Sequence, residues 1–162
     1  QIVAKCNPSI FRLDQLLEVF PDARIVYVVR SPQKSIRSFM AFTQRFVGEV
    51  LTAEEQRRFY RRKYQWSVRL YRYFEEVKST IPADQLMVVP FQEIAGGVEE
   101  PLRRFFAFNN ITPPQDYWDG YEDDEEGNHT RKHTNPPLEE FGITQEEIQR
   151  DLGFVWQHYL TA

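Results

Sequence analysis

The sequence has little of three features that each mark a class of protein. It holds one cysteine, Cys6, which excludes an intrachain disulfide and favours the cytoplasm over an oxidising compartment. No apolar run approaches the roughly 20 residues of a membrane-spanning helix. The net charge of -4 lacks the basic surplus of nucleic-acid-binding proteins. The 162 residues, 41% of them hydrophobic, are instead enough for one globular domain with a core.

A buried strand followed by a helix is the clearest pattern in the chain. Residues 24–29 have almost no polar interruption, which is typical of a central strand buried on both faces of a parallel sheet. Ser31 suits a helix N-cap and Pro32 the first helical position, so we expect a helix from Pro32 to about Val47. The side chains expected to face the core from this helix are Ile36, Phe39, Met40, Thr43, Phe46 and Val47.

Two polar residues indicate an anion site at the junction of this strand and helix. Arg30 follows the strand directly, at the carboxyl end where open α/β sheets bind ligands, and its guanidinium is suited to phosphate. Ser38 lies off the apolar face, near the first turn of the helix, where free N–H groups and the helix dipole favour an anion. The alternative is an Arg30 paired with a carboxylate and a Ser38 that faces water.

Several motifs of the first 38 residues occur in a characteristic order. They are Lys5-Cys6-Asn7-Pro8, a Phe-Pro-Asp-Ala-Arg turn at 20–24, the hydrophobic strand, an Arg-x-Pro at 30–32 and a serine eight residues after Arg30. This order resembles the sulfotransferase family. The resemblance implies an α/β chain with a partial P-loop-NTPase-like three-layer fold, in which helices flank a central parallel sheet. It also implies that Arg30 and Ser38 hold the 3'-phosphate of 3'-phosphoadenosine 5'-phosphosulfate (PAPS).

Later segments extend the resemblance more weakly. Residues 87–94 look like a later strand of the family with the segment that follows it, and residues 101–108 look like the next helix. Phe91 stands where many members have a tyrosine near the adenine, so a stacking face is kept. Arg131 and Lys132 lie where the family places a basic loop that closes over the nucleotide. Alternatively, these two are exposed cations that balance the acidic run just before them.

Two features depart from the family pattern. The loop that holds the 5'-phosphosulfate is nowhere in the chain, and residues 1–4 read like a strand entered from upstream. We therefore expect residues 1–162 to be a single, partial sulfotransferase-like domain that lacks its N-terminal part and is inactive alone. A location in the Golgi lumen would fit this protein if a membrane anchor preceded the domain. Asn7 stands where some members carry the catalytic base, and an amide cannot take a proton from a hydroxyl at neutral pH.

The implied reaction moves a sulfuryl group from PAPS to a hydroxyl or amine of a carbohydrate or small-molecule acceptor. Such a transfer depends on positioning and on neutralising charge. Lys5 is the residue here that could stabilise charge near the reacting atoms, the alternative being a surface lysine at a strand end. No metal site is expected, because the histidines share no ligand spacing with a carboxylate or cysteine. They are His129, His133 and His158.

A long helix is expected in the middle of the chain. Residues 52–55 form a capping box, and nothing breaks the helical pattern until about Lys78. The basic residues at 57–63 could bind an anionic glycan, or they form a solvated face paired with nearby glutamates. Tyr64 and Trp66 could line an acceptor pocket, although aromatic residues at helical spacing are more often core. The expected packing stripe is Phe59, Trp66, Leu70, Tyr73, Phe74 and Val77.

Two further elements complete the expected fold. A strand is predicted over residues 85–89, after the turn that ends the long helix. Residues 144–147 form a second capping box, which begins a terminal helix. That helix is expected to pack rather than catalyse, through Ile148, Leu152, Val155, Trp156 and Tyr159.

Two other classes of function remain open at this point. A nucleotide or small-molecule kinase with a P-loop-like fold shares the strand, arginine and helix arrangement, and it would require ATP and magnesium. A non-catalytic binding module would use the basic aromatic helix at 52–78 as its surface, and Asn7 favours that reading.

Overall fold

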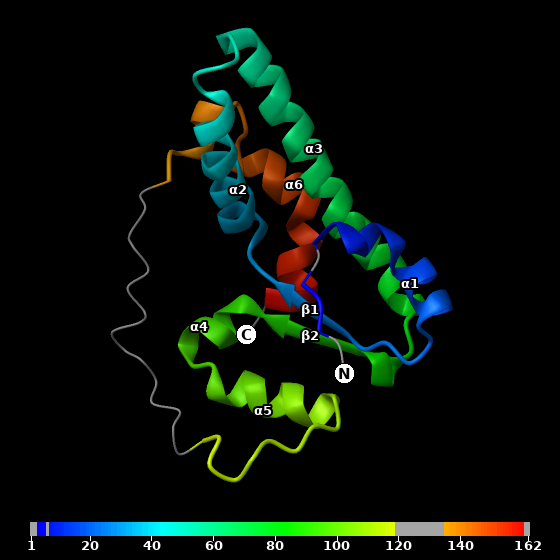
Figure 1. The fold of residues 1–162 in the computed structure, drawn as a ribbon. Helices are drawn as coiled ribbons and strands as arrows, with labels where there is room; N and C mark the ends of the chain where they lie inside the picture. Colours follow the sequence, from blue (N-terminus) through cyan, green and yellow to red (C-terminus); the bar gives the residue numbers. More distant parts are fainter. Residues whose placement is uncertain (1–2, 6, 119–134, 161–162) are drawn as a thin grey trace.

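The computed structural model describes residues 3–5, 7–118 and 135–160. Two parallel strands and six α-helices form most of this part, with short 3-10 helices between them and a π-helix at the end (Figure 1). The elements in chain order are η1 (Asn7–Arg12), α1 (Leu13–Val19), β1 (Ile25–Val29), α2 (Pro32–Val47), α3 (Ala53–Val77), η2 (Lys78–Thr80), η3 (Ala83–Gln85), β2 (Leu86–Pro90), α4 (Phe91–Gly96), α5 (Glu99–Phe108), η4 (Leu138–Phe141), α6 (Gln145–Val155) and η5 (Trp156–Leu160).

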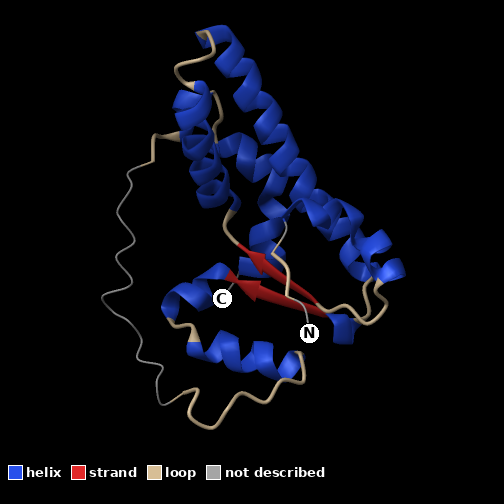
Figure 2. Cartoon of the chain, in the orientation of Figure 1, coloured by secondary structure: helices blue, strands red, loops and turns tan. Residues whose placement is uncertain are grey.

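The described sheet has two strands and is parallel, as expected. Ile25 lies opposite Leu86 and Val29 opposite Pro90, so the carboxyl ends of both strands meet at one edge. The crossover between them runs through α2 and α3. Helices lie on both sides of this small sheet, with α2, α3 and α6 on one side and α4 and α5 on the other (Figures 1 and 2). The chain is therefore a helix-rich α/β protein, and the sheet seen here is smaller than the central sheet that the resemblance implies.

The two faces of β1 are covered unequally. Tyr27 packs against both core clusters, and its ring stacks on Phe74 of α3 with centroids 3.6 Å apart. On the opposite face Val28 is 47% exposed, so the expectation of a strand buried on both faces is wrong there. The reason is the position of α5, which contacts β2 and helps to bury Met87 and Val89. It does not cover the neighbouring side chains of β1.

Helix α2 has the predicted bounds, Pro32–Val47, with Ser31 at the N-cap position. Its buried side includes Ile36, Met40 and Thr43 as expected, and also Ala41. Phe46 is 64% exposed, so its assignment to the core is wrong. Both α3 and α6 pack against α2 on the side that carries Ala41. Phe46 lies on the opposite side of the helix and is exposed.

Helix α3 begins as predicted and buries a different face from the one expected. The Thr52 side chain accepts a hydrogen bond from the Glu55 backbone, and the Glu55 carboxylate accepts one in return, which completes the capping box. Of the expected stripe, Phe74 is fully buried but Trp66 is 39% exposed. The buried face, which contacts α2 and α6, is rotated by about one residue from the expected stripe. It consists of Tyr60, Tyr64, Ser67, Val68, Tyr71 and Phe74.

The terminal helix α6 begins at the predicted capping box and packs through the residues that were expected to pack. Thr144 and Glu147 form the second capping box. Ile148, Leu152 and Val155 are 0% exposed and share a core cluster with residues of α2 and α3. Trp156 and Tyr159 of η5 pack partly buried against that cluster. Among the described residues, no helix combines the length and apolar character needed to cross a bilayer.

Candidate functional site

A cavity of about 680 Å³ lies between β1, η1, α1 and the facing sides of α2 and α3. Three of its lining residues are cations, Lys5, Arg24 and Arg30, and none of the described lining residues is a carboxylate. Because unpaired positive charge favours anionic ligands, this balance is suited to a phosphate-bearing molecule. The remaining lining residues are mostly apolar or aromatic: Ala4, Ile10, Leu13, Leu16, Ile25, Val26, Tyr27, Val28, Ser35, Phe39, Trp66, Ser67, Leu70 and Tyr71.

Arg30 lies at the end of β1 and lines this cavity. One hydrogen bond to its backbone and one contact of its guanidinium with an aromatic ring hold it in place. Its carbonyl oxygen accepts a hydrogen bond from the Tyr71 hydroxyl at 3.0 Å. Its guanidinium carbon lies 4.8 Å from the centroid of the Phe91 ring, a cation–π distance. The Nε atom is buried without a hydrogen-bond partner. Within residues 3–5, 7–118 and 135–160, no carboxylate forms an ion pair with this side chain.

Tyr71 is a residue of this site that the sequence analysis missed. It projects from α3 onto the junction of β1 and α2, and burial raises the pKa of its hydroxyl above the ordinary value. The group therefore stays a protonated donor that fixes the backbone of Arg30. The spacing 60, 64, 67 and 71 is a regular helical face, so reading that face as the core would have placed Tyr71 inward.

Ser38 lies further along α2 than expected. It is the seventh residue of the helix, about two turns from Pro32, so the expectation that it lies near the first turn is wrong. The free N–H groups of a helix belong to its first four residues. Ser35 occupies that first turn and lines the cavity with Arg30, whereas Ser38 is partly buried and is not among the lining residues.

The other site residues fall in three different places. Lys5 is exposed and lines the cavity. Phe91 begins α4 directly after β2 and is 37% exposed, with one ring face against Arg30 rather than open to a base. Arg131 and Lys132 lie outside the described residues, as do the acidic run and the histidines at 129 and 133.

The chain that follows this undescribed segment is fixed to α2. Arg37, the neighbour of Ser38, donates from Nε to the carbonyl of Pro136 at 2.9 Å and from Nη2 to the carbonyl of Asn135. Asn135 is three residues after Lys132 in the sequence. Asn135 and Pro136 therefore lie beside the helix that carries Ser38.

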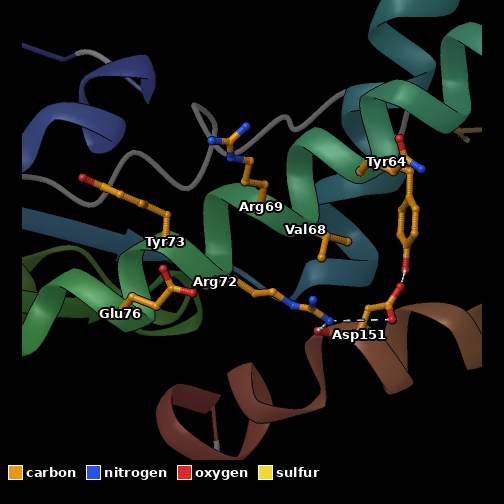
Figure 3. A pocket seen from close by; sticks show the side chains of 8 residues that line it. Tyr64, Val68, Arg69, Arg72, Tyr73, Glu76 and Asp151 are labelled. Carbon is orange, nitrogen blue, oxygen red and sulfur yellow. Dashed lines mark hydrogen bonds and ion pairs between the residues drawn. The ribbon is translucent and has the colours of Figure 1, made fainter.

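A second hollow of about 490 Å³ lies between α3 and α6 (Figure 3). Here Asp151 accepts hydrogen bonds from the Tyr64 hydroxyl at 2.8 Å and from Arg150 at 3.1 Å, and Arg72 donates to its backbone carbonyl at 3.3 Å. The hydrogen bond from Arg150 holds the pKa of Asp151 below its usual range, and that from Tyr64 adds to the effect. Since these polar groups already satisfy one another, the hollow is a structural contact between helices. Tyr64 is core here rather than part of an acceptor pocket.

The described histidine also belongs to a structural cluster. His158 Nδ1 lies 2.8 Å from a Glu75 carboxylate oxygen that also pairs with Lys78 at 2.8 Å. Among the described residues, no group of three or more histidine, cysteine or acidic side chains could hold a metal ion.

An uncompensated arginine at the carboxyl end of a parallel strand, above the start of a helix, is the arrangement of proteins that bind phosphate groups. The comparison with protein families makes the assignment more specific. The model described as "Sulfotransferase family" matches residues 1–115 of the 162, so the chain belongs to the sulfotransferase family. Membership gives sulfuryl transfer as the general class of reaction. Searches of curated proteins and of solved structures found no match.

Proposed function

We propose that this protein takes part in sulfuryl transfer from PAPS to a hydroxyl or amine of a carbohydrate or small-molecule acceptor. The observation that carries the proposal is the cavity with three cations and no lining carboxylate, in which the Nε of Arg30 is buried without a partner. A buried donor without an acceptor costs free energy unless a ligand supplies one. The family match to residues 1–115 supports sulfuryl transfer in general, and a phosphosulfate nucleotide is the anionic donor that we propose for this cavity.

The proposed roles are those that the family resemblance implies, and the contact with Arg30 adds one for Phe91. Arg30 binds the 3'-phosphate with Ser38, and the cation–π contact makes Phe91 a positioning residue for Arg30 as well as a neighbour of the adenine. Arg131 and Lys132 supply further positive charge over the nucleotide. In this proposal β1 and β2 belong to a P-loop-like sheet, and residues 1–162 belong to one sulfotransferase-like domain.

The chemistry asked of the protein is mainly neutralisation of charge. The acceptor oxygen or nitrogen forms a bond to sulfur while the bond from sulfur to the 5'-phosphate oxygen breaks, so negative charge develops on the departing bisphosphate nucleotide. We assign the stabilisation of that charge to Lys5, an exposed residue that lines the cavity. The acceptor proton needs a base other than the amide of Asn7.

A non-catalytic binding module is the second candidate, and Asn7 favours it. Such a module would keep the nucleotide site at Arg30 without turning over the donor. A kinase is distinguished by its ligand, because it would select ATP with magnesium.

Thermal-shift titration of the chain with 3'-phosphoadenosine 5'-phosphate tests the proposal. We expect a concentration-dependent rise in the unfolding midpoint that ATP with magnesium does not reproduce at equal concentration. Arg30→Ala should remove the rise, whereas Arg72→Ala, in the paired hollow, should keep it. No rise in the wild-type chain would contradict the nucleotide site. Turnover of PAPS on an offered acceptor would exclude the binding module.

A further inference from the structure

The turn between α2 and α3 carries an exposed apolar edge that the proposed nucleotide site does not use. Phe42 is 56% exposed, Phe46 64% and Val50 78%, and the rings of the two phenylalanines contact each other edge-to-face with centroids 5.1 Å apart. Figure 1 shows this turn at the end of the molecule farthest from the sheet. The edge is therefore a projecting tip and not the wall of a cavity. We call residues 42–63 the hairpin tip.

Positive charge is concentrated on the same tip. Residues 45–63 contain six arginines or lysines and three glutamates, a balance of +3 in a chain whose net charge is -4. Two of the glutamates are already engaged, Glu54 with Arg58 and Glu55 in the capping box. Arg45 and Arg62 are exposed and form no ion pair with any described residue. Counted on its own residues the tip is therefore cationic, and one of its six cations, Arg61, pairs with Glu147 of α6 at 2.8 Å.

One contact joins the cations of α3 to the aromatic side of α2. The Lys63 ammonium lies 5.8 Å from the ring centroid of Phe39 and 5.3 Å from that of Phe59. Phe39, Phe42 and Phe46 follow each other at helical spacing along one side of α2. Aromatic and basic side chains thus share one surface of the tip.

We propose that the hairpin tip docks onto the surface of an anionic lipid bilayer. Interfacial segments combine large apolar side chains, which enter the boundary between headgroups and acyl chains to a depth of about 5–10 Å, with cations at headgroup level. The exposed side chains of Phe42, Phe46 and Val50 would enter that boundary. The unpaired Arg45 and Arg62 would meet the lipid phosphates.

The size of the apolar edge favours a bilayer over a protein partner. From their exposed fractions, Phe42, Phe46 and Val50 present roughly 350 Å² of apolar surface. A stable protein interface needs about 800 Å² from each partner. A soluble anionic polymer would use the cations but gives no reason for three exposed apolar side chains. The bilayer accounts for both.

Vesicle co-sedimentation of the chain tests this proposal independently of nucleotide binding. Vesicles of phosphatidylcholine with about 30% phosphatidylserine should bind the chain at least tenfold more tightly than pure phosphatidylcholine vesicles, and the difference should shrink in high salt. The double variant Phe42→Ser/Phe46→Ser should lower the partition coefficient about tenfold or more. Phe20→Ser is the matched control, because Phe20 is 59% exposed in the turn after α1 and should leave partitioning unchanged.

The charge contribution has its own matched pair. Arg45→Gln/Arg62→Gln should weaken binding to the anionic vesicles severalfold, while Arg12→Gln, an exposed arginine at the end of η1, should not. Circular dichroism should show all variants folded, since every changed side chain is exposed. Equal partitioning of wild type and Phe42→Ser/Phe46→Ser would overturn the proposal. So would a dimer in solution that the double variant abolishes, because the edge would then be a contact between two copies.

Discussion

The two hollows of the molecule both contain arginines, and they differ in what those arginines contact. In the hollow between α3 and α6, Arg72 and Arg150 are bonded to Asp151, which also accepts from Tyr64. In the cavity at the end of β1, Arg30 has a buried Nε without a partner and no carboxylate lines the walls. Arg72, Arg150, Tyr64 and Asp151 already contact one another at the first hollow, so a ligand that used them would have to break those contacts. The cavity at the end of β1 offers positive charge that an anionic ligand can neutralise.

The largest expected difference between the two hollows is in nucleotide affinity. Arg30→Ala should weaken binding of 3'-phosphoadenosine 5'-phosphate by about 2 kcal/mol or more, because a charge-assisted contact to phosphate is lost. Arg72→Ala should leave the affinity unchanged. Isothermal titration calorimetry measures both. Equal affinities for the two variants would break the comparison and the assignment with it.

The converse effect is expected on stability. Tyr64→Phe removes the hydroxyl that donates to Asp151 at 2.8 Å. Hydrogen bonds to charged groups contribute about 1.5 kcal/mol or more, so the free energy of unfolding in urea should fall by about that amount. Nucleotide affinity should not change. If Tyr64→Phe unfolded at the wild-type midpoint, the hollow between α3 and α6 would not be the structural contact inferred here.

A smaller effect is expected at the ring beside Arg30. Phe91→Ala removes a cation–π contact of 4.8 Å at a partly exposed site, and such contacts contribute about 0.5–1 kcal/mol. We expect nucleotide affinity to fall two- to fivefold, and Phe91→Tyr should preserve it because the ring face is kept. A loss in Phe91→Ala as large as that in Arg30→Ala would mean that the ring binds the base directly.

The smallest effect concerns pH and the paired cluster at the end of α3. Burial alone would raise the pKa of Glu75, but hydrogen bonds from Lys78, Tyr159 and His158 outweigh it, so the pKa lies below the ordinary value. A depressed pKa contributes stability that is present above the unfolded-state pKa and is lost as pH falls through the folded-state value. Below about pH 5 the thermal midpoint of the wild type should therefore fall more steeply than that of Glu75→Gln. Parallel pH profiles would contradict this.

Local signals in the sequence predicted the helix starts well. The capping boxes at Thr52 and Thr144 and the proline at position 32 specify backbone geometry within a few residues, and all three mark observed helix starts. The strands were predictable for a similar reason, because short runs of β-branched residues between turns are typical of β-strands.

The buried faces of the helices were harder to predict, because they depend on distant partners. Helix α3 carries aromatic residues on two adjacent faces, and the sequence alone does not say which one meets α2 and α6. Trp66 was therefore placed inward and Tyr71 missed, although Tyr71 holds the backbone of Arg30. Phe46 shows the same limit. Of the site, Arg30 could be placed from the strand end, whereas the role of Phe91 required knowing that β2 lies beside β1.

The position of η4 and α6 has a consequence for how this protein can be divided. The family match stops at residue 115, yet Leu138, Phe141 and Ile148 lie in the same core cluster as Met40 and Tyr60. A chain shortened to the matched segment would leave that apolar surface of α2 and α3 open to water. It would be expected to aggregate instead of behaving as a minimal enzyme. The end of the family match and the end of the packed core are therefore at different residues.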